Sequence, residues 1–170
     1  MKKGIITAIN VAAVAIPLGV YAAGPLFVNT TIDEPLPATP GQDDAMAEDK
    51  GGMSGESGID YELSGSFVGV GDGIHDASGQ AKVIPQEEGR ILRLEEFRAT
   101  NGPDLYVYLS TDKQASEYVS LGKLKGNIGN QNYDIPEGTD LDKYGTVLIW
   151  CQQFSVLFGS AGLSESPVAA

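Results

Sequence analysis

The sequence contains one cysteine and one histidine, and this scarcity of ligands excludes most metal and redox centres. A blue-copper site needs two histidines and a cysteine, whereas structural zinc and iron–sulfur clusters need about four cysteine or histidine ligands. Covalent haem attachment needs a Cys-x-x-Cys-His motif, and a dithiol oxidoreductase needs a second cysteine. We therefore expect no metal site within this chain, and any thiol chemistry depends on Cys151, with His75 as the one histidine that could assist it.

Basic residues are also few, because 11 lysines and arginines stand against 23 aspartates and glutamates, giving a formal charge of -12. Contact with the phosphates of nucleic acids needs a basic surface, so we expect no nucleic-acid partner. The acidity is concentrated between Asn29 and Asp60, where eight acidic residues occur with Lys50 as the one basic residue.

Charged residues are absent between Gly4 and Val28, and two lysines precede this run. As a helix its roughly 25 residues would span about 37 Å, enough to cross a bilayer. The pattern predicts a transmembrane anchor over residues 1–28, with the rest of the chain on the extracytoplasmic side. The alternative is a cleaved signal peptide with Ile5–Val20 as its apolar core. The apolar character continues to Val28, which favours the anchor, and both interpretations export the domain.

Large apolar residues are rare in residues 29–60, which instead contain several prolines, glycines and acids. Such a segment cannot bury enough surface to offset its conformational entropy. We expect a flexible acidic linker over residues 29–60, and a disordered tail over residues 164–170.

Residues 61–163 differ in composition, with short segments rich in Val, Ile, Tyr and Phe that are separated by Gly, Pro, Asn and Asp. This pattern is typical of an all-β fold, and we expect an antiparallel β-sandwich. The predicted strands are Tyr61–Val70, Gln80–Ile84, Arg90–Arg98, Asp104–Ser110, Tyr118–Lys123, Gln131–Ile135 and Thr146–Phe158. One helical turn is expected over Thr139–Tyr144, capped by Thr139 or Asp140.

The last predicted strand determines on which face of the sheet Cys151 is expected. If Thr146–Phe158 runs unbroken, alternate residues share a face, and the larger apolar set must face the core. That set is Leu148, Trp150, Phe154, Val156 and Phe158. Cys151 is then expected on the opposite face, partly sheltered, unless a bulge at Gln152-Gln153 changes the alternation.

Several sequence blocks in residues 61–163 together resemble the DM-thirteen domain, also called the electron-transfer DM domain. The blocks are Gly65-Ser66-Phe67, Gly79-x-Ala81, Gly102-Pro103-Asp104-Leu105-Tyr106-Val107-Tyr108-Leu109, Leu121-Gly122-x-Leu124-x-Gly126-Asn127-x-Gly129-x-Gln131-x-Tyr133-x-Ile135-Pro136 and Trp150-Cys151-x-x-Phe154-x-Val156-x-Phe158. The resemblance implies a β-sandwich, often found beside haem-binding DOMON domains in exported or membrane-anchored proteins. It also implies a redox role centred on Cys151, as a bare thiol or as a ligand to a prosthetic group.

Three roles for Cys151 stay open. It could ligate a b-type haem, opposite His75 or a methionine. It could act as a single redox thiol through sulfenic acid or a mixed disulfide. It could also fill space in the core, as free cysteines commonly do. The sequence does not identify the cofactor, and His75 lies in a Gly/Asp-rich loop where a histidine is reachable.

The leading hypothesis is a membrane-tethered extracytoplasmic domain that takes part in electron transfer through Cys151 and exchanges electrons with a redox partner protein. The alternative is a non-catalytic interaction or adhesion module in which Cys151 is structural. A third interpretation has Cys151 forming an intermolecular disulfide.

Overall fold

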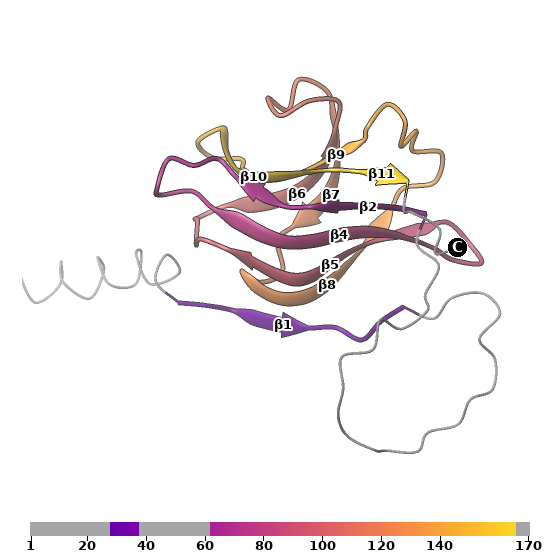
Figure 1. Ribbon diagram of the computed structural model, residues 1–170, viewed down its shortest axis with the longest axis horizontal. Helices are drawn as coiled ribbons and strands as arrows, with labels where there is room; N and C mark the ends of the chain where they lie inside the picture. Colours follow the sequence, from indigo (N-terminus) through magenta and orange to yellow (C-terminus); the bar gives the residue numbers. More distant parts are fainter. Residues whose placement is uncertain (1–27, 38–61, 166–170) are drawn as a thin grey trace, which may run out of the picture.

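The computed structural model describes residues 28–37 and 62–165, which form strands arranged in two sheets (Figure 1). The strands are β1 (Thr31–Asp33), β2 (Leu63–Ser66), β3 (Val68–Gly69), β4 (Ala77–Pro85), β5 (Arg90–Ala99), β6 (Leu105–Ser110), β7 (Tyr118–Lys123), β8 (Ile128–Ile135), β9 (Thr146–Cys151), β10 (Val156–Gly162) and β11 (Ser164–Glu165). The predicted anchor, except Val28, lies outside the described residues. Within the described ranges, no helix is long and apolar enough to cross a membrane.

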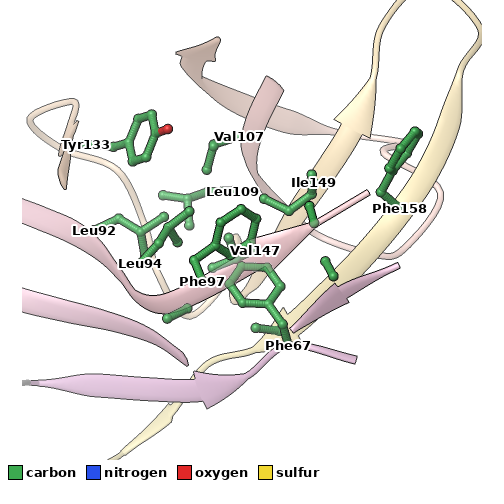
Figure 2. Close-up of a cluster of buried hydrophobic side chains, with 14 of the residues drawn as sticks. Phe67, Leu92, Leu94, Phe97, Val107, Leu109, Tyr133, Val147, Ile149 and Phe158 are labelled. Atoms are coloured by element: carbon green, nitrogen blue, oxygen red, sulfur yellow. The ribbon is translucent and has the colours of Figure 1, made fainter. Parts of the chain in front are cut away.

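The two sheets enclose one core, which confirms the all-β, sandwich-like prediction. One sheet has the order β1-β8-β5-β4-β2-β11 and the other has the order β3-β10-β9-β6-β7. Every pairing is antiparallel except that of β1 with β8, which is parallel. Aromatic and aliphatic side chains from both sheets fill the space between them (Figure 2).

A bulge in β5 keeps its apolar residues directed into this core. Leu92 and Leu94 are buried two residues apart, and the next buried residues are Phe97 and Ala99. The register shifts between Leu94 and Phe97 against β8, and Glu96 has a φ of 48°. The extra residue restores the inward direction of the side chains that follow, as a bulge does in an antiparallel pair.

The prediction of one continuous strand over Thr146–Phe158 is wrong, because two strands occupy this region. Residues 152–155 form a turn that joins β9 to β10 as a hairpin. Phe154, expected in the core, is 62% exposed, whereas Val147, Ile149 and Cys151 lie in the core. Ser155 has a φ of 53°, which lies outside the range of an extended strand.

The start of the predicted linker and the start of the predicted tail are ordered strands, contrary to the expectation of flexibility. Thr31–Asp33 pairs with β8, and Ser164–Glu165 pairs with β2. Both segments add to sheet edges through backbone hydrogen bonds, which need no apolar side chains. The rest of the predicted linker and tail, residues 38–60 and 166–170, lies outside the described residues.

The helical turn before β9 is confirmed, with Asp140 as its cap. The Tyr144 N–H donates to the carbonyl oxygen of Asp140 at 2.9 Å. Asp140 Oδ1 accepts the N–H groups of Asp142 and Lys143 at 3.1 and 3.2 Å, as an N-terminal cap does.

We expect the domain to lose stability at alkaline pH through Tyr133. Its hydroxyl donates to Gln131 Oε1 at 2.8 Å, and burial raises the pKa of Tyr133 to about 12. An unfolded tyrosine titrates near pH 10, so the stabilisation is complete below about pH 10 and is lost as pH rises toward 12. The free energy of unfolding should fall by about 2 kcal/mol over this interval.

Urea unfolding at a series of alkaline pH values measures this loss. Tyr133→Phe removes the titrating group, so the variant should show a flatter pH dependence whatever its stability at neutral pH. An equal slope in both proteins would contradict the assignment to Tyr133.

Candidate functional site

Cys151 is the last residue of β9 and is enclosed by the core. It pairs with Leu105 of β6 and Val156 of β10, and it is 1% exposed. In the described part of the chain the thiol is free and has no hydrogen-bond or charged partner. The expectation of a partly reachable thiol on the face opposite the core is therefore wrong, because Trp150 and Leu148, not Cys151, point away from the core.

The hairpin tip that follows Cys151, residues 152–155, is exposed. The register of β9 and β10 shifts between Leu157 and Gly159, which leaves only the pairs Cys151–Val156 and Trp150–Leu157 beyond the shift. One further backbone hydrogen bond holds the turn, from the Gln152 N–H to the Asp104 carbonyl oxygen at 3.0 Å. The left-handed backbone of Ser155 adds strain of about 1 kcal/mol. The tip is thus held by few contacts, and it follows the buried thiol directly in the chain.

His75 forms a dyad with Asp72 in the β3–β4 loop. The two side chains meet at 2.6 Å between His75 Nδ1 and Asp72 Oδ2, and they are 27% and 42% exposed. The other carboxylate oxygen accepts the His75 and Ile74 N–H groups at 2.7 and 2.8 Å. Hydrogen bonds from the His75 backbone and side chain lower the pKa of Asp72 to about 2. The carboxylate thus holds one ring nitrogen and leaves Nε2 without a partner among the described residues.

Cys151 and His75 do not form a working pair. The structure records no hydrogen bond or ion pair between them in the residues it describes. The His75 ring instead packs on Phe158, with 4.6 Å between ring centroids, and Phe158 belongs to the same core as Cys151. His75 therefore lies over the core from outside, so a Cys–His nucleophile is absent.

An aromatic row crosses the outer face of the second sheet. Tyr118 stacks on Tyr108 with 4.1 Å between centroids, Tyr106 follows at 6.0 Å from Tyr108, and Tyr106 pairs in register with Trp150. Beside Trp150 lies a hollow of about 520 Å³, lined by Val68, Gly69, Val70, Lys113, Gln114, Trp150, Leu157 and Ser160. The alternation Tyr106-x-Tyr108 is the sequence signal that places these two rings on a common face of the strand.

A family model for electron-transfer DM13 domains matches residues 69–163, more than half of the chain. The chain belongs to the DM13 electron-transfer family. The match confirms the resemblance to DM-thirteen domains, and it runs from the end of β3 to just after β10, including His75 and Cys151. No curated protein and no solved structure matches the chain.

The surroundings of Cys151 in this DM13 domain do not fit a haem. A haem thiolate ligand needs a cleft for the flat macrocycle and a second ligand or open position opposite it. Cys151 is enclosed by close-packed side chains, and the one histidine is held by Asp72 and Phe158 outside the core. In the described residues no group of three His, Cys, Asp or Glu side chains could hold a metal ion. We therefore assign no step to a haem.

Proposed function

We propose that this DM13 protein is a membrane-tethered extracytoplasmic electron-transfer domain whose redox group is the Cys151 thiol, sheltered by the core and uncovered when the β9–β10 hairpin tip opens. The observation that carries this proposal is that the chain's one thiol stands at the end of β9, immediately before an exposed turn with a left-handed residue. The charge-free run from Gly4 to Val28 after two lysines supports the tether and the extracytoplasmic side.

The chemistry open to a single cysteine is exchange with a disulfide of a partner protein. The Cys151 thiol loses its proton, and the thiolate attacks one sulfur of the partner disulfide. The partner's S–S bond breaks, a new S–S bond joins Cys151 to one partner sulfur, and the other sulfur leaves and takes up a proton. A second partner thiol must then resolve the mixed disulfide, because this chain has no other cysteine.

The full chain in sealed membrane vesicles tests both parts of the proposal. We expect the protein to stay with the membrane after alkaline carbonate extraction, and its C-terminal domain to be accessible only from the extracytoplasmic side. Incubation with oxidised glutathione should add one glutathione per chain, and Cys151→Ala should add none. Release by carbonate would contradict the tether, and absence of the mixed disulfide under native conditions would contradict the thiol.

A second candidate, an interaction module with a structural cysteine, is favoured by one observation, the 1% exposure of Cys151. In that case the thiol would react only when the whole domain unfolds, and Cys151→Ala would leave every function intact. The hollow beside Trp150 would then be the surface for a partner. A covalent dimer would keep two Cys151 residues permanently at a surface, so the 1% exposure of Cys151 in the folded domain does not support it.

A further inference from the structure

The segment 28–35 lies along the β8 edge of the first sheet as a parallel strand (Figure 1). Its pairs are Thr31 with Ile128, Ile32 with Gly129, and Asp33 with Asn130. The segment precedes the part of the chain that the DM13 family model matches. It lies outside the matched part of the chain and is bound to an edge that would otherwise present unpaired backbone groups.

Three asparagines of the domain bind this segment along its length. Asn127 serves the start of the segment, Asn130 its middle and Asn132 its end. Their contacts are Asn127 Nδ2 to Asn29 Oδ1 (2.9 Å), the Thr30 N–H to Asn127 Oδ1 (2.7 Å), Asn130 Nδ2 to Asp33 Oδ1 (2.7 Å) and Asn132 Nδ2 to the Pro35 carbonyl oxygen (2.9 Å). Two of these four contacts are made to the backbone of the segment and two to its side chains, so the asparagines bind both the extended chain and its polar residues.

Two basic side chains of the domain bind the acidic end of the segment. Lys125 Nζ lies 2.8 and 3.0 Å from the two carboxylate oxygens of Glu34, and the Asn132 N–H donates to the same carboxylate at 2.6 Å. Arg93 Nη1 donates to the carbonyl oxygens of Glu34 and Pro35 at 3.3 and 3.2 Å. Burial acts to raise the pKa of Glu34, but the bonds from Lys125 and Asn132 outweigh it and lower the pKa.

The domain also leaves space for the segment by means of glycine. A Cβ at Gly126 would stand 2.6 Å from the Thr30 carbonyl oxygen and 2.7 Å from Ile32 Cγ1. A Cβ at Gly129, whose φ is +104°, would collide with the Ile32 backbone. The β8 edge is thus shaped to receive this backbone closely.

The docked segment has few apolar contacts to hold it. Residues 28–31 are exposed, and Ile32 is only half-buried. Exposed ion pairs such as Lys125–Glu34 contribute little, and polar edge contacts open before a core does. The segment can therefore leave β8 while the sandwich stays folded.

We propose that the β8 edge is a recognition site for segment 28–35, and that docking there sets how far the domain stands from the membrane. This inference rests on the proposed tether. When the segment is docked, the chain reaches the domain surface directly after Val28, and the end of the sandwich at Asn101 and Asn127 faces the bilayer. When the segment is released, the 33 residues from Asn29 to Tyr61 separate the membrane from the domain. Fully extended, they span at most about 115 Å.

Spin labels on the full chain test this proposal without dependence on the membrane. Labels at Val28→Cys and Glu87→Cys, in a Cys151→Ala background, should give one narrow distance distribution. Glu34→Lys should broaden the distribution and shift it to longer distances, and adding Lys125→Glu should restore the narrow component. Gly126→Ala should act like Glu34→Lys, because the atoms nearest to the new Cβ belong to the segment.

Glu117→Lys is the matched control, because it reverses an exposed carboxylate that binds Lys143 away from β8. It should leave the distance distribution unchanged. Distributions that stay narrow in both Glu34→Lys and Gly126→Ala would overturn the recognition site, even with the tether intact.

A second experiment places the chain, spin-labelled at Glu87→Cys, in lipid nanodiscs that contain spin-labelled headgroups. Glu34→Lys should lengthen the distance between the label on the domain and the labels on the lipid. No change in that distance would contradict the proposal that docking sets how far the domain stands from the membrane. Failure of the chain to enter nanodiscs would contradict the tether, and with it this proposal. The distances in solution would still show whether the segment docks.

Discussion

Replacing Phe97 by alanine should lower the free energy of unfolding by about 3–5 kcal/mol. Phe97 is 1% exposed and meets Phe67 edge-to-face, with 5.3 Å between ring centroids (Figure 2). It comes from β5, whereas Phe67 precedes β3, so the contact joins the strands of the first sheet to the entry into the second. Removing the ring leaves a cavity that a close-packed core cannot fill, and the loss is a large part of a stability of roughly 5–15 kcal/mol.

Phe154→Ala is the matched control for this prediction. The same side chain is removed, but Phe154 is 62% exposed in the β9–β10 turn, so the cost should stay within about 0.5 kcal/mol. Urea unfolding of the two variants measures the difference. Equal losses would show that the core is not centred where the structure places it.

Gln131→Ala should be the second most damaging change, with an expected loss of about 3 kcal/mol or more, because three buried polar groups lose their partner. Gln131 is fully buried in β8. Its Oε1 accepts the Tyr133 hydroxyl at 2.8 Å and the Gly126 N–H at 3.1 Å, and its Nε2 donates to the Gly126 carbonyl oxygen at 2.8 Å. Alanine cannot satisfy any of these groups.

Gln80→Ala provides the corresponding control, because the Gln80 amide is exposed and bonds only to Ser66, at 3.0 and 3.2 Å. We expect a change below about 0.5 kcal/mol. Chemical unfolding at neutral pH separates the two variants. A small cost for Gln131→Ala would mean that water replaces the amide, contrary to its complete burial.

The regular strands of the domain could be predicted from sequence because alternation and turn residues are local signals. Tyr118–Lys123 was placed with its exact bounds, and the family blocks gave the sandwich. The face of Cys151 was predicted wrongly, because the core face was chosen by continuing the alternation of β9 to Phe154, Val156 and Phe158, and the turn at residues 152–155 interrupts that alternation. In the structure, Val147, Ile149 and Cys151 form the core face of β9.

The docking of residues 28–35 left no comparable signal. Its acidic and proline-rich composition favours disorder, and the pairing depends on asparagines about 100 residues later in the chain. The Asp72–His75 dyad could have been suspected from its spacing of three residues, but its packing on Phe158 depends on the tertiary fold. Contacts that depend on distant residues are thus the ones that sequence patterns miss.

The central claim is that Cys151 becomes reachable by local opening of the hairpin tip, and native-state labelling kinetics test it most directly. The rate of modification by a small maleimide is measured in the native protein, in Ser155→Gly and in Gln131→Ala. Glycine relieves the left-handed strain at Ser155, so the first variant should label more slowly, by up to roughly tenfold.

Gln131→Ala weakens the whole domain through the other sheet, so it should leave labelling through the tip unchanged. Opening of the tip alone is expected to give a slower rate in Ser155→Gly and the native rate in Gln131→Ala. If labelling instead accelerates in Gln131→Ala in proportion to its loss of global stability, the thiol is reached only by complete unfolding, and Cys151 is a structural residue.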